Sequence, residues 1–229
     1  MTFETRTYSE PTEPVGNVAE LFAGVGGFRI GLAAAGWKTV FSNQWEPSTK
    51  AQHASNVYAA RFGEDGHTNV DVATVEALPK DVDLLVGGFP CQDISVAGNG
   101  AGLDGARSGL WGEMARIIGE VRPRFVFVEN SPMLTSRGLG RVLGDLASMG
   151  FDARWGVLGA ADIGANHQRD RIWIVAKWRG QLSHTQHNRI RRWEQQQKSL
   201  KKEERRSQIS NTNGIRLDES KTEWNKSGE

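Results

Sequence analysis

The sequence predicts an α/β domain built on an open sheet, followed by a basic tail without a core of its own. Short apolar runs of the length of buried strands alternate with segments that have helical spacing. Glycine-rich turns follow two of these runs, at residues 23–27 and 87–88. Open α/β sheets bind ligands in the crevice beyond the carboxyl ends of their strands, so we expect the functional residues in and near these turns.

Composition limits the class of protein. At 229 residues the chain forms one large domain, or one domain and a tail. A single cysteine excludes an intramolecular disulfide and a cysteine-based zinc site, which favours an intracellular compartment. No apolar run approaches the roughly 20 residues of a membrane span, and the acidic N-terminus does not resemble a signal peptide. We expect a soluble, cytoplasmic protein that does not contact membranes.

Charge is distributed unevenly along the chain, although its net value is only +1. Residues 177–229 carry 13 Lys and Arg against 7 Asp and Glu, whereas residues 1–176 carry 15 against 20. The last 53 residues contain no Ala, Val or Phe and cannot build a core. We expect a flexible lead-in over 1–16, the folded domain over 17–176, and a partly helical or disordered tail over 177–229 that contacts nucleic-acid phosphates.

The first strand is expected over 17–22. It runs into the glycine turn, and residues 28–35 have the spacing of a helix that ends at Gly36. Strand, glycine turn and helix together are typical of a nucleotide-type site, because glycines let the backbone approach a ligand and the N–H groups at a helix start bind anions. A dinucleotide fingerprint needs a third glycine where this chain has Arg29, so NAD is disfavoured.

The second strand, expected over 38–42, is followed by Gln44, Trp45 and Glu46. Glu46 lies about 20 positions beyond the glycine turn, where an acidic residue usually holds a ribose hydroxyl. Trp45 is suited to stacking on an adenine. An exposed carboxylate that caps the next helix and a tryptophan in the core explain the same pattern equally well, so both interpretations stay open.

The only cysteine lies just past the tip of a strand. After a helix over 48–61 and a short strand over 68–72, we expect a buried strand over 82–86 that the two glycines before Cys91 terminate. An accessible thiol there, with its pKa lowered by a nearby cation or by backbone N–H groups, is a candidate nucleophile. The alternative is an inert, buried cysteine. Residues 98–109 contain five glycines and are typical of a mobile lid.

A second chemical group ends the next strand. After a helix over 110–120, a strongly apolar strand over 124–128 leads directly into Glu129. We expect partial desolvation to raise the pKa of this carboxyl and to suit it to sharing a proton, unless it merely caps the next turn.

Two arginines precede the last expected strand. A helix over 138–149 and strands over 153–158 and 172–176 complete the domain. Arg169 and Arg171 point to the same side if their segment is extended, so that one of them can reach an acidic or carbonyl partner in the crevice. A solvated run of charges is the alternative.

Four of these stretches, in this order, resemble the motifs of the DNA (cytosine-5) methyltransferase family. The similarity covers about residues 17–176. The matching stretches are a cofactor loop, Phe22-Ala23-Gly24-Val25-Gly26-Gly27; a catalytic loop, Gly88-Phe89-Pro90-Cys91-Gln92; a Glu-Asn element, Glu129-Asn130; and an arginine element, Gln168-Arg169-Asp170-Arg171. Any one of these stretches could arise by chance in an unrelated protein, whereas four in this order and with the family's spacing are highly specific for the family.

The resemblance implies a doubly wound, Rossmann-like sheet that binds S-adenosyl-L-methionine, with no metal. The cofactor-binding residues that it implies are Phe22, Gly24, Gly26, Gly27, Gln44, Trp45, Glu46, Asp71, Val72, Pro90 and Leu110. The catalytic residues that it implies are Cys91, Glu129, Arg169 and Arg171. Family members methylate double-stranded DNA, and we expect this one in a prokaryotic or phage restriction-modification system.

The same resemblance implies the chemistry. These enzymes flip the target cytosine out of the duplex. Addition of the Cys91 thiolate to carbon 6 makes carbon 5 nucleophilic, while Glu129 stabilises the proton on ring nitrogen 3. Arg171 matches the family's contact to the base carbonyl, and Arg169 supports the loop. Carbon 5 takes the methyl group, and loss of its proton with expulsion of Cys91 restores the ring.

The chain departs from the family's pattern at three positions and lacks one region. The usual acidic ribose ligand aligns with Gln44, Ser131 replaces the Val of the Glu-Asn-Val element, and His167 replaces the Gln that opens the arginine element. Nothing in residues 177–229 matches the family's target-recognition region or the C-terminal element that covers the cofactor and the first helix. We expect a truncated chain, or one that needs a second polypeptide, with weak cofactor binding and little turnover alone.

Three other functions remain as alternatives. A relative that methylates transfer RNA carries the same motifs. A non-catalytic fragment or subunit could bind nucleic acid through the basic tail, although an intact set of Cys91, Glu129 and Arg171 argues against decay of the site. An NAD oxidoreductase is disfavoured by Arg29 and by the lack of a hydride-transfer constellation.

Overall fold

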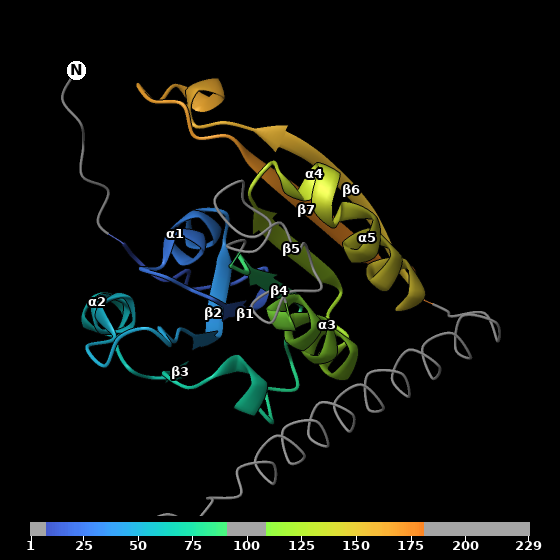
Figure 1. Ribbon diagram of the computed structural model, residues 1–229. Coiled ribbons are helices and arrows are strands. Elements are labelled where there is room, and N and C mark those ends of the chain that lie inside the picture. The colour runs from blue at the N-terminus through green and yellow to red at the C-terminus, as the bar shows by residue number, and fades with distance from the viewer. Residues whose placement is uncertain (1–7, 91–108, 181–229) are drawn as a thin grey trace, which may run out of the picture.

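A computed structural model describes residues 8–90 and 109–180, and the structural statements below concern these residues. Their strands form one seven-stranded sheet in the order β3-β2-β1-β4-β5-β7-β6 (Figure 1). The strands are β1 (Gly16–Leu21), β2 (Trp37–Asn43), β3 (His67–Thr68), β4 (Leu84–Gly87), β5 (Phe125–Asn130), β6 (Phe151–Leu158) and β7 (Arg171–Trp178). The helices are α1 (Gly27–Ala34), α2 (His53–Phe62), α3 (Gly109–Val121), α4 (Leu134–Arg137) and α5 (Leu139–Ser148).

The strand order has a switch point between β1 and β4. The chain runs outward from β1 through β2 to β3, then returns to place β4 and β5 on the other side of β1. All of these neighbours pair in parallel, whereas β7 is antiparallel to both β5 and β6. The doubly wound sheet implied by the family resemblance is therefore confirmed. A ligand crevice is expected where the carboxyl ends of β1 and β4 diverge.

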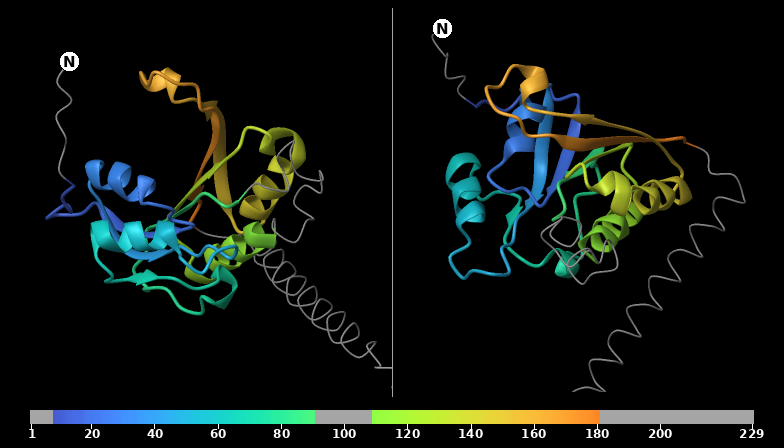
Figure 2. Two further views of the ribbon diagram at one scale, coloured as in Figure 1. Left: turned by 60° about the vertical axis from the view of Figure 1, so that its left-hand side comes forward. Right: turned by 45° about the horizontal axis from the view of Figure 1, so that its top comes forward.

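Helices cover both faces of the sheet, but unequally (Figure 2). On one face, α1 packs Phe28 and Leu32 against Val18 of β1. On the other face, α3, α4 and α5 close the main core, which includes Met114, Ile117, Leu134, Val142 and Leu146. Over β5, β7 and β6, the α1 side of the sheet carries no helix from the described part of the chain, so Trp173 and Val175 there stay accessible to a pocket.

The strand β6 forms one edge of the sheet and is only partly covered. Phe151, at its start, is buried beside α5, whereas every residue from Arg154 to Leu158 is exposed. Trp155 and Val157 are each 49% exposed, on the face of β6 that α5 covers only at the start of the strand. Among the described residues, the outer side of β6 therefore pairs with no other strand, and apolar side chains at this end of the sheet are uncovered.

Two expected elements differ from the structure. The strand expected over 68–72 pairs only at His67–Thr68, after which Asp71 accepts a hydrogen bond from the Ala73 N–H and caps a 3₁₀ turn, Val72–Thr74. A short polar side chain that bonds to its own backbone competes with the strand ladder. The helix expected over 48–61 begins only at His53, because Gln52 has a left-handed φ of 47° and bonds to the preceding loop.

Part of the expected flexible lead-in is held against the domain by a buried arginine. Arg29 of α1 donates to the Tyr8 hydroxyl and forms an ion pair with Glu10. Its guanidinium also lies over the Phe62 ring, 4.8 Å from the centroid, which is the geometry of a cation–π contact. Arg29, which sequence analysis used only to disfavour NAD, thus joins α1, α2 and residues 8–10.

Candidate functional site

A first pocket of about 750 Å³ lies beyond the carboxyl ends of β1 and β2. Its walls come from the turns after these strands, from the 3₁₀ turn and from the start of α3. Seven of the eleven expected cofactor residues line it: Phe22, Trp45, Glu46, Asp71, Val72, Pro90 and Leu110. The remaining lining residues are Asn43, Pro47 and Ser48.

The glycine turn shapes the base of this pocket without lining much of it. Phe22 has a left-handed φ of 55°, which is uncommon for a bulky residue and typical of functional sites. The Gly24 N–H donates to Oε1 of Gln44 at 2.8 Å, so Gln44 holds the turn. Gln44, Gly24 and Gly26 do not line the first pocket, and Gly27 lines the second pocket described below.

The two interpretations left open for Trp45 and Glu46 can now be separated. Trp45 is 40% exposed and lines the pocket, so it is not a core tryptophan. The Glu46 carboxylate accepts a hydrogen bond from the Ala54 N–H at 2.8 Å, in the first turn of α2, and also lines the pocket. The capping interpretation therefore holds for one oxygen of Glu46, while the side chain still forms part of the wall.

A second pocket of about 1300 Å³ adjoins the first, and Phe22 lines both. It lies between α1 and the uncovered side of β5, β7 and β6, and its walls are mainly apolar, with Phe28, Phe127 and Trp173 among them. Gly88, Glu129, Arg169 and Arg171 also line this pocket. Three of the four expected catalytic residues are thus brought together beside the expected cofactor pocket.

Glu129 is held by an arginine from the neighbouring strand. Arg171 Nε lies 2.7 Å from Glu129 Oε1, and both side chains are about one quarter exposed. A Cβ added to Gly88 would lie 2.7 Å from Glu129 Oε2, so a side chain there would displace the carboxylate. Arg169 is exposed at the rim of the same pocket. Cys91 lies outside the described residues.

The chain that leads to Cys91 is anchored by residues that sequence analysis did not assign a role. Asn130 is 2% exposed, and its Nδ2 donates to the Phe89 carbonyl at 3.0 Å. Trp111 of α3 packs on the Phe89 ring, 5.5 Å between centroids. A role for Asn130 could have been predicted from its place in the Glu-Asn element at the end of a buried strand, because buried amide groups are almost always hydrogen-bonded.

Within residues 8–90 and 109–180, no group of three or more His, Cys, Asp or Glu side chains is placed to hold a metal ion. No helix of these residues is long and apolar enough to cross a membrane.

The two left-handed glycines of the turn allow a matched test. Gly24 (φ 56°) has open space where a Cβ would be, whereas a Cβ at Gly26 (φ 88°) would overlap the Phe62 ring. Both alanine substitutions cost about 1–2 kcal/mol for the left-handed backbone. Gly26→Ala should cost about 1–3 kcal/mol more, because the Phe62 ring must move. Urea unfolding of the two variants measures the difference, and equal losses would contradict the Phe62 contact.

Comparisons with known proteins agree with this arrangement. A family model described as C-5 cytosine-specific DNA methylase matches residues 16–228. The Type II methyltransferase M.Sau3AI of Staphylococcus aureus is 39% identical over 173 residues, which are 69% of this chain and 42% of that protein. M.HhaI of Haemophilus parahaemolyticus is 34% identical over 160 residues, 68% of this chain and 47% of that protein. The chain spans about half the length of the curated relatives it matches.

Solved structures share the fold. The Dnmt2 methyltransferase of S. pombe superposes with a TM-score of 0.57 at 20% identity, over 73% of this chain and 52% of that chain. The Entamoeba histolytica methyltransferase EhMeth gives a TM-score of 0.54 at 14% identity, over 77% of this chain and 56% of that chain. At these identities the likeness concerns the fold alone.

Proposed function

Because the chain belongs to the C-5 cytosine-specific DNA methylase family, we propose that it carries the catalytic half of a DNA (cytosine-5) methyltransferase. The enzyme would transfer a methyl group from S-adenosyl-L-methionine to carbon 5 of a cytosine flipped out of double-stranded DNA. One observation carries the proposal. The two pockets meet at Phe22, one lined by seven expected cofactor residues and the other by the Glu129–Arg171 pair.

The first pocket fits S-adenosyl-L-methionine in shape and in chemistry. Its apolar walls at Phe22, Val72 and Leu110 suit the faces of an adenine ring, and the carboxylates of Glu46 and Asp71 suit its amino group and the ribose hydroxyls. When bound, the cofactor supplies an electrophilic methyl group. Gln44 keeps the glycine turn in place through Gly24, so we propose that ribose recognition falls to Glu46 in this chain.

Cys91 and residues that line the second pocket would act together on the base. Cys91 Sγ, as a thiolate, adds to carbon 6 and raises electron density at carbon 5. Glu129 holds the proton at ring nitrogen 3, and Arg171 orients the Glu129 carboxylate and contacts the base carbonyl. After methyl transfer, carbon 5 loses its proton and the Cys91 sulfur leaves, which restores the aromatic ring. Arg169, at the rim of the pocket, supports the loop.

We propose that further polypeptide covers the second pocket, either the rest of a longer chain or a second chain. Apolar side chains of Phe127, Trp173 and Val175 line this pocket on a part of the sheet that no helix of the described residues covers, and Phe28 of α1 borders it. In a doubly wound sheet such a face is normally covered. Until it is covered, we expect weak cofactor binding, little sequence specificity and little turnover.

The basic residues 177–229 would contact DNA phosphates. The relatives' bacterial origin favours the cytoplasm as the location of the protein.

Covalent trapping tests the proposal. The chain is mixed with labelled S-adenosyl-L-methionine and duplex DNA containing 5-fluorocytosine, whose carbon 5 cannot lose its substituent, so the adduct persists. We expect a labelled protein–DNA adduct of low yield that rises when the C-terminal half of a relative is added. Cys91→Ser should give none. Absence of an adduct in every arm contradicts the proposal, and label on an RNA substrate instead of DNA favours the RNA methyltransferase alternative.

A further inference from the structure

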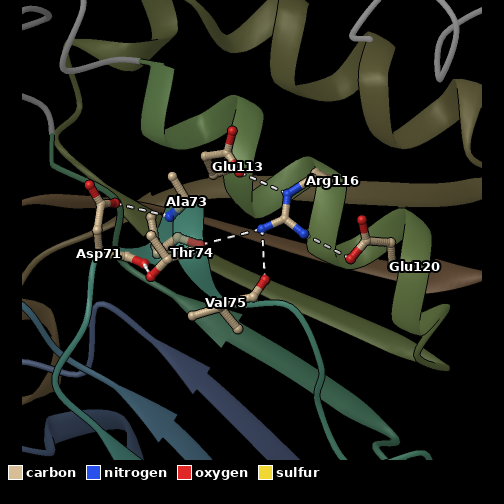
Figure 3. Close-up of polar contacts among 8 residues, drawn as sticks. Asp71, Ala73, Thr74, Val75, Glu113, Arg116 and Glu120 are labelled. Carbon is tan, nitrogen blue, oxygen red and sulfur yellow. Dashed lines mark hydrogen bonds and ion pairs between the residues drawn. The ribbon is translucent and has the colours of Figure 1, made fainter. Parts of the chain in front are cut away.

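One arginine of α3 contacts the backbone of the turn that forms a wall of the first pocket (Figure 3). Arg116 Nη2 donates to the carbonyls of Val72 and Val75, at 3.3 and 3.0 Å. Its Nε and Nη1 pair with Glu113 and Glu120, each at 2.8 Å. All three guanidinium nitrogens are therefore engaged, and the two ion pairs fix the orientation of the fork that meets the carbonyls.

The turn that Arg116 holds carries two lining residues. Asp71 accepts hydrogen bonds from the Ala73 N–H at 3.0 Å and from the Thr74 hydroxyl at 2.7 Å, which makes the turn a compact unit. Val72 is 3% exposed and lines the first pocket together with Asp71. A shift of the carbonyls of this turn therefore also shifts Asp71 and Val72, which form that wall of the pocket.

The helix that carries Arg116, α3, also supplies a lining residue of the first pocket. Leu110 lies in the first turn of α3, two turns before Arg116, and lines the same pocket. The helix is well anchored, since Trp111, Met114, Ala115, Ile117 and Ile118 are all buried. Because Val72 and Leu110 are held by the two elements that Arg116 joins, the length of this contact sets how far apart they lie.

We propose that Arg116 is a positioning residue for the cofactor, one that sets the width of the first pocket by fixing the 71–75 turn to α3. The inference rests on the proposed binding of S-adenosyl-L-methionine in that pocket. It concerns a residue that neither lines the pocket nor belongs to any of the four motifs. Without Arg116, the Val72 and Val75 carbonyls lose the donor that ties them to α3, and we expect the turn to move away from that helix.

Three variants separate this role from general stabilisation. Arg116→Met keeps the aliphatic stem and removes every polar contact. Arg116→Lys keeps the charge, but a single ammonium cannot reproduce the fork that reaches both carbonyls and both carboxylates. Glu120→Gln removes one ion pair at a side chain that is 52% exposed, while the carbonyl contacts of Arg116 remain.

The measurements are the dissociation constant for S-adenosyl-L-methionine by calorimetry and amide hydrogen exchange of residues 73–75 without ligand. We expect affinity to fall about tenfold in Arg116→Met and several-fold in Arg116→Lys, with faster exchange in both. Arg116→Lys should regain most of the melting temperature that Arg116→Met loses, because Lys keeps a cation between the carboxylates. Glu120→Gln should bind the cofactor as the unsubstituted chain does.

Two results would overturn the inference. One is unchanged affinity in Arg116→Met, and the other is affinity that follows melting temperature across all three variants, which indicates a structural role alone. If the unsubstituted chain does not bind S-adenosyl-L-methionine even with the C-terminal half of a relative added, the proposed function fails instead. Faster exchange at residues 73–75 in Arg116→Met than in the unsubstituted chain then still shows that Arg116 holds the turn.

Discussion

Glu129→Gln is expected to slow methyl transfer by at least about a hundredfold, which is the lower range for loss of a positioned acid–base group. The substitution keeps the size and planar shape of the side chain but removes its charge and its capacity to hold a ring proton. The fold should persist, because the ion pair with Arg171 is partly exposed and its loss costs about 1 kcal/mol or less. Single-turnover transfer of label to duplex DNA measures the effect.

Asp152→Asn is a matched control for this prediction. Asp152 is also a strand carboxylate paired with an arginine, Arg179, but it does not line either pocket. Its substitution should leave the transfer rate within about twofold of the unsubstituted chain. If Glu129→Gln and Asp152→Asn have equal effects, the role assigned to Glu129 is wrong.

Stability is expected to fall as pH rises from about 4.5 to 7, and Glu20 is the cause. Glu20 of β1 is fully buried; its Oε2 accepts a hydrogen bond from the Tyr58 hydroxyl at 3.0 Å, and its Oε1 has no partner among the described residues. Burial raises the pKa of this carboxyl to about 7, although the Tyr58 hydrogen bond and the nearby Arg29 lower it. His67, stacked on Tyr58, has a lowered pKa from burial and adds little positive charge at neutral pH.

The direction follows from proton binding in the two states. Between pH 4.5 and 7 the folded chain keeps a proton on Glu20 that the unfolded chain releases, so unfolding becomes easier as pH rises. At about 1.4 kcal/mol per pKa unit, the total loss is on the order of 3 kcal/mol. This contribution is complete at low pH and is lost once pH passes the folded pKa.

Glu20→Gln should remove this part of the pH dependence. The measurement is the free energy of unfolding in urea at several pH values between 5 and 8, with the slope rather than the absolute value as the result. Glu76→Gln, at an exposed carboxylate, serves as the control and should keep the slope of the unsubstituted chain. An unchanged slope in Glu20→Gln would show that Glu20 is already ionised in the folded state.

Sequence alone predicted the order and type of most elements, because apolar runs and glycine turns report local structure directly. It placed the glycine turn after β1 and Glu129 at the end of β5, and the structure has them there. The strand expected over 68–72 was placed correctly but is shorter, His67–Thr68, because Asp71 caps a 3₁₀ turn instead of continuing the strand. The sequence of residues 68–72 does not reveal whether the backbone there continues the strand or forms the capped turn.

The interactions that position the site were less predictable, since they join residues far apart in the chain. The contact of Arg116 with Val72 spans 44 residues, and that of Asn130 with Phe89 spans 41. Both bonds end on backbone carbonyls, which every residue possesses, so no side-chain pattern at the accepting position marks them. The reach of an arginine to an acidic partner was expected from spacing, but its identity as Glu129 depends on the β5–β7 register.

The uncovered end of β6 affects the tendency of this polypeptide to aggregate in a cell. Five successive exposed residues, Trp155 and Val157 among them, lie on this edge strand, whose outer side pairs with no other described strand. They offer hydrogen-bonding groups and apolar surface to any other extended chain. Intermolecular strand addition then competes with whatever normally shields this rim. Protein synthesised without that shield should therefore aggregate, and the yield of dispersed molecules would be low.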